Sequence, residues 1–177
     1  MIFWDPKLQK NLKQYLIQCL LATGSVFVLF LILDLNQHSA ILSTLGATIF
    51  VVFSLPHSYS SQPRRILGGY FWGTVIGILA HYLVLLPGAF SFSAILIGAL
   101  AAGITLFFMA ATNAEHPPAA GLAVGLIFNP WRLETLLVIW GAIIYLSIMR
   151  YLLRHWLIDL TEFPGFKKKF YKQKKRL

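Results

Sequence analysis

The stretch N-A-E-H-P-P-A-A-G at residues 113–121 decides the fold of this chain, because it places two prolines and two ionisable residues beside a very apolar sequence. The 49 residues that end at Ala114 contain no Lys, Arg, Asp or Glu. Proline is tolerated in the first turn of a helix, where its missing N–H would be unpaired anyway. His116, Pro117 and Pro118 therefore predict that one helix ends and another begins within the apolar region.

The composition around this stretch is that of a membrane protein. Of 177 residues, 58% are hydrophobic and 12% are charged, whereas soluble domains have about 45–50% apolar and about 25% charged residues. We expect one transmembrane domain over residues 14–160, between a basic cytoplasmic N-terminus (1–13) and a basic cytoplasmic tail (161–177). The first apolar run is predicted to be a retained span, since no small-x-small cleavage pattern follows it.

Four apolar runs are long enough to cross a bilayer as helices, which takes about 20 residues; they cover residues 15–33, 66–86, 94–111 and 133–153. Two shorter apolar segments, 39–56 and 118–128, lie between them. The order long, short, long thus occurs twice, over residues 14–86 and 93–155. Because each half has three segments, the second enters the membrane from the opposite side. We predict an all-α polytopic membrane protein of two inverted three-segment repeats, each with one short or broken helix. The alternative is a chance pair of short, Gly-rich segments.

The basic residues test the topology. Six crossings with a cytoplasmic N-terminus put 14 of the 15 Lys and Arg residues inside, with Arg132 outside. If both short segments are re-entrant hairpins, only four spans cross and 12 basic residues remain inside. The positive-inside rule therefore favours six segments in the cell inner (plasma) membrane, with both termini cytoplasmic. Since the charge lies mainly in the two tails, we expect anionic lipid rather than nucleic acid as its partner.

The helix break predicts an anion site. Free backbone N–H groups at a helix start, together with the positive end of the helix dipole, bind anions. The first short segment offers a comparable start with hydroxyl groups, so two helix N-termini would bracket one small inorganic anion near mid-membrane. The alternative is that the Ser and Thr hydroxyls bond to carbonyls of their own helix. The residues expected to bind the anion are Ser43, Thr44, Gly46, Asn113, His116, Ala119, Ala120 and Gly121.

Two ionisable residues indicate proton coupling. An ionisable side chain within the membrane is taken as a candidate for a functional role. We expect Glu115 to favour the charged form of His116. His116 would then take up a proton together with the anion. The alternatives are an interfacial histidine and a solvated glutamate. Arg64 and Arg65 are interpreted as topology anchors, or else as guards of an anion entrance.

The glycines Gly69, Gly73 and Gly77 stand four residues apart. This spacing predicts close packing against another helix, in this chain or in a second copy. A homo-oligomer, a dimer or higher, is therefore expected.

The function predicted from these residues is a transporter or channel for a small inorganic anion. The chain has no Walker A, HExxH, GxSxG or CxxC motif, so we expect no enzyme, no cofactor and no metal site. The alternative is a non-transporting scaffold or accessory subunit that binds partner helices and anionic lipid. In a transporter the two short segments would converge on a polar cavity, whereas in a scaffold their ends would be dry or apart.

The motif E-H-P-P-A-A-G resembles a signature of the HPP family of integral membrane proteins, named for His-Pro-Pro. L-G-A-T-I-F-V-V-F-S-L-P (45–56) followed by S-Q-P-R-R-I-L-G-G-Y (61–70) resembles the family's other signature. Members in plastids and cyanobacteria are linked to nitrite transport, so the resemblance implies nitrite as the anion. The family is usually described with four membrane segments, whereas the charges here favour six. Carried over by position, the motif or entrance residues are Gly46, Ala47, Gln62, Pro63, Arg64, Gly68, Gly69, His116, Pro117 and Pro118.

Overall fold

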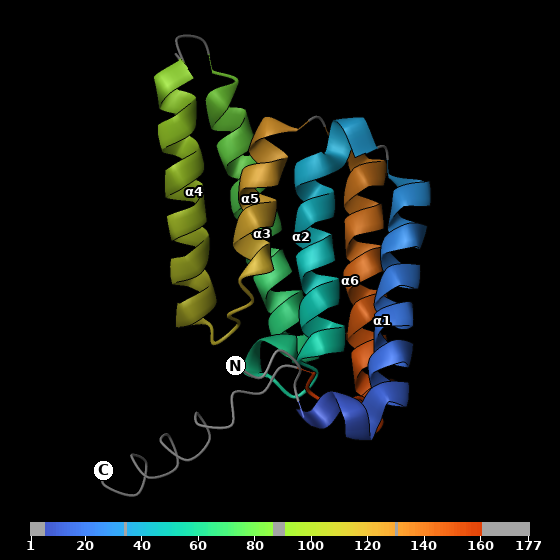
Figure 1. Cartoon of the computed structure of the whole chain (residues 1–177). Helices are drawn as coiled ribbons and strands as arrows, with labels where there is room; N and C mark the ends of the chain where they lie inside the picture. The colour runs from blue at the N-terminus through green and yellow to red at the C-terminus, as the bar shows by residue number, and fades with distance from the viewer. Residues whose placement is uncertain (1–5, 34, 87–90, 130, 161–177) are drawn as a thin grey trace, which may run out of the picture.

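The computed structural model describes residues 6–33, 35–86, 91–129 and 131–160, and these fold into a bundle of six α-helices without a β-strand (Figure 1). A short 3₁₀ helix, η1 (Tyr59–Ser61), lies between α2 and α3. The predicted all-α fold is confirmed. The helices are α1 (Pro6–Ile32), α2 (Leu35–Ser54), α3 (Pro63–Val84), α4 (Ser91–Ala111), α5 (Pro118–Phe128) and α6 (Leu133–Leu153).

Four helices are long and apolar enough to cross a membrane, and two apolar helices are shorter, as predicted. The spans lie in α1, α3, α4 and α6. Helix α2 kinks at His38, and its apolar part runs from His38 to Ser54. Helix α5 has only 11 residues, which is about 16 Å of helix at 1.5 Å per residue.

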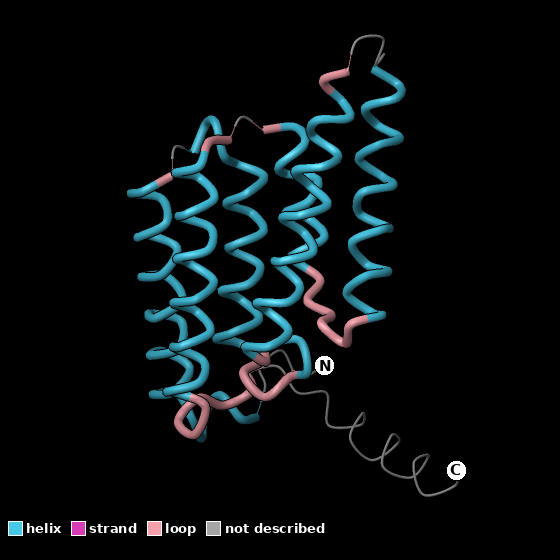
Figure 2. Tube along the Cα trace, turned by 180° about the vertical axis from the view of Figure 1, so that it is seen from behind, coloured by secondary structure: helices cyan, strands magenta, loops and turns pink. Residues whose placement is uncertain are grey.

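Successive helices alternate in direction along the bundle (Figures 1 and 2). This alternation is compatible with the six-segment interpretation, in which neither short helix is part of a re-entrant hairpin. Helix α1 packs on α2 as α4 packs on α5, while α2 contacts α5 and α3 contacts α6. This arrangement is compatible with two inverted repeats.

Basic residues gather at one end of the bundle. The starts of α1 and α3 and the end of α6 lie at one end of the bundle, and the start of α6 lies at the opposite end (Figure 1). Along the chain, Lys10 and Lys13 follow the start of α1, Arg64 follows the start of α3, Arg154 directly follows α6 and Arg132 directly precedes it. The expected basic tail at 161–177 and residues 1–5 lie outside the described residues.

The predicted glycine face packs on α5 of the same chain. A Cβ atom added to Gly73 would lie 2.4 Å from the backbone oxygen of Ala119, and one added to Gly77 would lie 3.0 Å from the Cα atom of Ala123. A Cβ atom at Gly69 would lie 2.8 Å from Cβ of His116. Small residues thus let α3 and α5 approach backbone to backbone, and this face is closed to a second copy.

The segment after α6 folds back over the end of the bundle and joins α1 to α2. The side chain of Gln18, which has no exposed surface, donates to the carbonyls of Phe53 and Ile158 and accepts from the N–H of Ile158. Leu160 donates its N–H to the carbonyl of Ser54 at 2.8 Å. We call residues 154–160 the closing strap.

Candidate functional site

The helix break at residues 112–117 returns the chain into the bundle. Asn113 adopts a left-handed conformation with φ of 55°. The N–H of Ala114 donates to the carbonyl of Met109 at 2.8 Å, and the N–H of Asn113 to that of Ala110 at 3.1 Å. This is the Schellman arrangement that ends a helix. Helix α5 then starts at Pro118, with a proline in its first turn as predicted.

His116 lies between these two helices with no exposed surface. Its Nδ1 atom is 2.8 Å from the carbonyl oxygen of Ser60, and its Nε2 atom is 2.9 Å from Oγ1 of Thr48. A carbonyl oxygen can only accept, so we assign the ring proton to Nδ1 from the hydrogen-bond network. In the neutral ring, Nε2 then accepts from the hydroxyl of Thr48.

Thr48 and Tyr70 continue this hydrogen-bonded chain through the bundle. The two hydroxyl oxygens are 2.7 Å apart, and both also reach the carbonyl oxygen of Thr44, at 3.1 Å in each case. Tyr70 has no exposed surface and neither has Thr48. The hydrogen-bonded chain runs from Tyr70 through Thr48 and His116 to the carbonyl oxygen of Ser60, and it links α2, α3 and the segments that follow α2 and α4. Polar groups buried among membrane helices are costly unless paired, and they mark functional positions.

A second polar cluster covers His116 on the side of the basic end. Arg65 Nη1 is 2.5 Å from Glu115 Oε2, and Arg65 Nη2 is 3.0 Å from Asn113 Oδ1. The guanidinium also lies over the ring of Tyr59, whose hydroxyl donates to Asn113 Oδ1. Ser60 Oγ donates to the carbonyl of Glu115 at 3.3 Å. We call these five residues the polar lid.

The backbone amides predicted to be free are paired. Ala119 donates to the carbonyl of His116 at 2.9 Å and Ala120 donates to that of Pro117 at 3.2 Å. These bonds tighten the first turn, which is a common way to satisfy a helix start. The prediction of unpaired donors is wrong for these two residues. Their role as anion ligands, and that of Gly121, stays a prediction.

The first short segment does not start where the sequence predicted. Helix α2 begins at Leu35, so Ser43 and Thr44 lie inside the helix and not at its N-terminus. Their hydroxyls donate to Ser39 and Ile41 of their own helix, at 3.0 and 2.8 Å, as in the alternative interpretation. Helices α2 and α5 nevertheless meet, because a Cβ atom on Gly121 would lie 2.9 Å from Cγ2 of Thr44.

Gly46 is not part of this junction. It lines an outer cleft of about 580 Å³ between α1 and α2.

The expected influence of Glu115 on His116 is wrong. The carboxylate binds Arg65 instead, and His116 lies outside the four spans in a buried loop. Burial lowers the pKa of His116 to about 4, although its hydrogen bond to Ser60 acts in the other direction. The histidine is therefore neutral near pH 7.

Arg65, and not the motif residue Arg64, faces the junction. Arg64 and Gln62 are exposed, whereas Arg65 is 5% exposed. One signal for Arg65 is present in the sequence, because it stands four residues before Gly69 and so shares the face of the glycines. Thr48, which stands one turn after Thr44, and Tyr70 were not predicted from the sequence. Pro63 starts α3 and Pro117 precedes α5.

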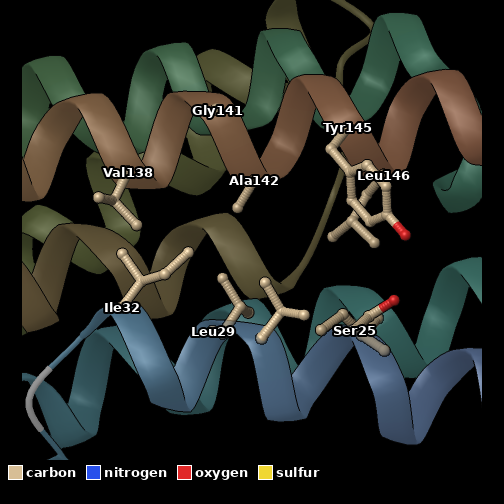
Figure 3. A pocket seen from close by; sticks show the side chains of 10 residues that line it. Ser25, Leu29, Ile32, Val138, Gly141, Ala142, Tyr145 and Leu146 are labelled. Carbon is tan, nitrogen blue, oxygen red and sulfur yellow. The ribbon is translucent and has the colours of Figure 1, made fainter.

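An apolar outer cleft lies away from His116. It has a volume of about 370 Å³ between α1 and α6 and is lined mainly by aliphatic side chains (Figure 3). Ser25 and Tyr145 lie at one end of it (Figure 3), and the hydroxyl of Ser25 donates to the carbonyl of Leu21 in its own helix. Ser25 and Tyr145 are the polar side chains among the residues that line this cleft, and none of the lining residues is charged.

Comparison with known protein families gives a match over most of the chain. The family described as HPP, transmembrane region, matches residues 7–156. The chain belongs to the HPP family. In this HPP protein the match includes the His-Pro-Pro turn, the polar lid, helices α2 to α6 and all but the first residue of α1. A transmembrane protein of Dictyostelium discoideum is 28% identical over 89 residues, which cover 50% of this chain and 30% of that protein. The aligned part thus spans less than a third of that relative. No solved structure matches the HPP chain.

The buried histidine predicts a specific loss of stability in acid. The folded-state pKa of His116 is about 4, against about 6.5 when the ring is in water. Between these values the unfolded chain binds more protons, so stability is complete above pH 6.5 and falls by about 3 kcal/mol as the pH approaches 4. We expect His116→Gln, which cannot titrate, to flatten this part of the profile of melting temperature in detergent between pH 7.5 and 4.5. Equal slopes for wild type and variant would contradict the prediction, and the exposed His155→Gln is the control.

Proposed function

We propose that this HPP protein carries a small inorganic anion across the membrane at the junction of α2, α3 and α5. The observation that supports it is a half-length helix that begins inside the bundle beside a buried polar chain. His116 bonds to the same threonine as Tyr70, and Tyr70 lies seven residues into α3, or about 10 Å of helix. Broken helices at such depth are tolerated where they line a substrate path, and they form the sites of many transporters.

The hydrogen-bonded chain can accept a proton without losing a bond. If Nε2 of His116 is protonated, it donates to Thr48, and the Thr48 hydroxyl turns to the carbonyl of Thr44, 3.1 Å away. The groups that face the ring are Thr48 from α2, the phenol of Tyr70 from α3 and the carbonyl of Ser60. None is a carboxylate, and Glu115 is held by Arg65. A proton on His116 therefore requires a new negative charge beside it, and a bound anion supplies one.

Nitrite is the first candidate for this anion. It follows from the family resemblance, since HPP members are linked to nitrite transport. Nitrate, formate and bicarbonate are the alternatives of similar size. The positive end of the α5 dipole points toward the same junction and favours a negative charge there.

The orientation that we propose puts the basic end of the bundle in the cytoplasm of a cell with an inner (plasma) membrane. The helix ends beside which Lys10, Lys13, Arg64 and Arg154 stand in the sequence lie at that end (Figure 1), and the positive-inside rule assigns such an end to the cytoplasm. The polar lid then faces the cytoplasm.

The scaffold remains the competing function, and one observation favours it. The start of α5 meets the middle of α2 on side chains with no exposed surface, His116 and Thr48, as expected of a dry junction. The glycine face, in contrast, is used within the chain and is closed to partner helices. Transport therefore has to be measured directly.

The test is uptake of nitrite into proteoliposomes at pH 6 and pH 7.5. We expect saturable uptake that rises at the lower pH after the diffusion of nitrous acid into empty liposomes is subtracted. His116→Ala should reduce it by about tenfold or more, since one lost charge-assisted contact is worth about 1.4 kcal/mol or more. The control is His155→Ala, an exposed histidine at the same end. Uptake by folded wild-type protein no greater than into empty liposomes would exclude the transporter.

A further inference from the structure

The polar lid stands between water and the buried histidine. His116 has no exposed surface, and η1 and the start of α3 are joined to the loop before α5 by bonds from Ser60 to Glu115 and from Tyr59 and Arg65 to Asn113. An anion that approaches from the basic end has to separate these segments before it reaches the ring. The bond between Arg65 and Glu115 is the only ion pair among the described lid residues.

The two partners of this ion pair differ in their access to water. The side chain of Arg65 is 5% exposed, whereas that of Glu115 is 39% exposed. If the pair separates, the carboxylate can turn into solvent and be hydrated, but the guanidinium stays among buried groups. A buried cation without a partner is strongly unfavourable. Opening of the lid is therefore much easier when another anion replaces the carboxylate on Arg65.

The other charged side chains considered at this end are paired elsewhere or exposed, so none of them takes part in the ion pair at Arg65. Arg150 donates to the carbonyl of Pro56, and Asp159 accepts from the N–H of His57 and lies 3.4 Å from its ring. Arg64 is exposed on a different face of α3. Within the described part of the chain, Arg65 is the buried cation beside His116.

We propose that the transported anion displaces Glu115 from Arg65, and that this exchange opens the polar lid. The proposal rests on the transport function above and names its substrate class. Arg65 directs Nη1 to Glu115 and Nη2 to Asn113, side by side. A planar oxyanion with two oxygens, such as nitrite or formate, can take both bonds that the guanidinium fork offers. A spherical halide cannot, so planar oxyanions are selected over chloride.

The proposed exchange predicts that substitutions of Glu115 and of Arg65 change the KM for nitrite in opposite directions. Glu115→Gln keeps the shape but removes the competing charge, so the KM for nitrite should fall by about tenfold. Arg65→Lys keeps the charge but loses the fork, so the KM should rise by about tenfold. The control is Arg154→Lys, which should change the KM by less than about twofold because that side chain is exposed and lies after α6, outside the polar lid. Glu115→Asp restores a carboxylate and should return the KM toward the wild-type value.

Binding is measured beside transport, as the rise in melting temperature that nitrite causes in detergent. Glu115→Gln should show the larger rise at equal nitrite concentration, and sodium chloride should cause little rise in either protein. If wild type takes up nitrite but Glu115→Gln has an unchanged or higher KM, the exchange is wrong and the transport function stands. If nitrite binds with the predicted order of variants but is not taken up, the exchange site stands and the transport function fails. If nitrite neither binds nor moves, both are wrong.

Discussion

Replacing Gly73 by alanine should destroy the contact between α3 and α5 and leave little folded protein. The new Cβ atom would lie 2.4 Å from the carbonyl oxygen of Ala119 and 3.2 Å from its carbonyl carbon. These are backbone atoms of α5, so no side chain can turn away to make room. Overpacking of a core costs about 1–3 kcal/mol and sometimes more, and we expect the upper part of this range. The measurement is the yield of monodisperse protein and its melting temperature in detergent.

The matched control for Gly73→Ala is Gly141→Ala. Gly141 also lies within a membrane helix, but a Cβ atom there would meet nothing within 4 Å. Alanine is favoured over glycine in helices by about 1 kcal/mol, so this variant should be as stable as wild type or more stable. Equal melting temperatures for the two variants would show that the contact between α3 and α5 does not limit stability.

Replacing Gln18 by leucine should cost nearly as much, by a different mechanism. The buried amide satisfies the carbonyls of Phe53 and Ile158 and the N–H of Ile158. Leucine has a similar volume but no polar atom, so these three backbone groups would be left unpaired. Each unsatisfied buried group costs about 1–3 kcal/mol, which gives a loss of about 4 kcal/mol in total. We expect a lower melting temperature and faster proteolysis of the closing strap.

The control for Gln18→Leu is Thr23→Leu on the same helix. Thr23 is exposed on α1, and an apolar residue there faces lipid, so stability should change by less than about 0.5 kcal/mol. If both variants melt at the same temperature and the closing strap is cleaved no faster in Gln18→Leu, the strap does not contribute to stability.

The membrane segments could be predicted because their signals are local. Apolar length alone placed the last span at 133–153 and the short segment at 118–128, and α6 and α5 have these bounds. The prolines after His116 predicted the break, because they restrict the backbone at their own positions. The start of segment 39–56 was predicted four residues too late, since residues 35–38 are mostly polar and apolar length does not detect them.

The site could be predicted only in part, because its other features depend on contacts between distant segments. Whether Arg64 or Arg65 is buried depends on which side of α3 meets α5, and neighbouring residues on a helix point about 100° apart. Gln18 owes its role to residues 53 and 158, which nothing near it in the sequence reveals. The pairing of the Ala119 and Ala120 amides likewise depends on how the chain turns after His116.

The length of α5 has a consequence for the biosynthesis of the protein. Its 11 residues make about 16 Å of helix, roughly half of the hydrocarbon thickness of about 30 Å. The segment is thus too short to be held in lipid on its own as it leaves the ribosome. Its insertion requires α3 to be in the bilayer already, because α5 packs against Gly69, Gly73 and Gly77 of that helix. Assembly of the bundle therefore depends on an order of insertion, with α5 placed by its neighbours and not by the translocation machinery.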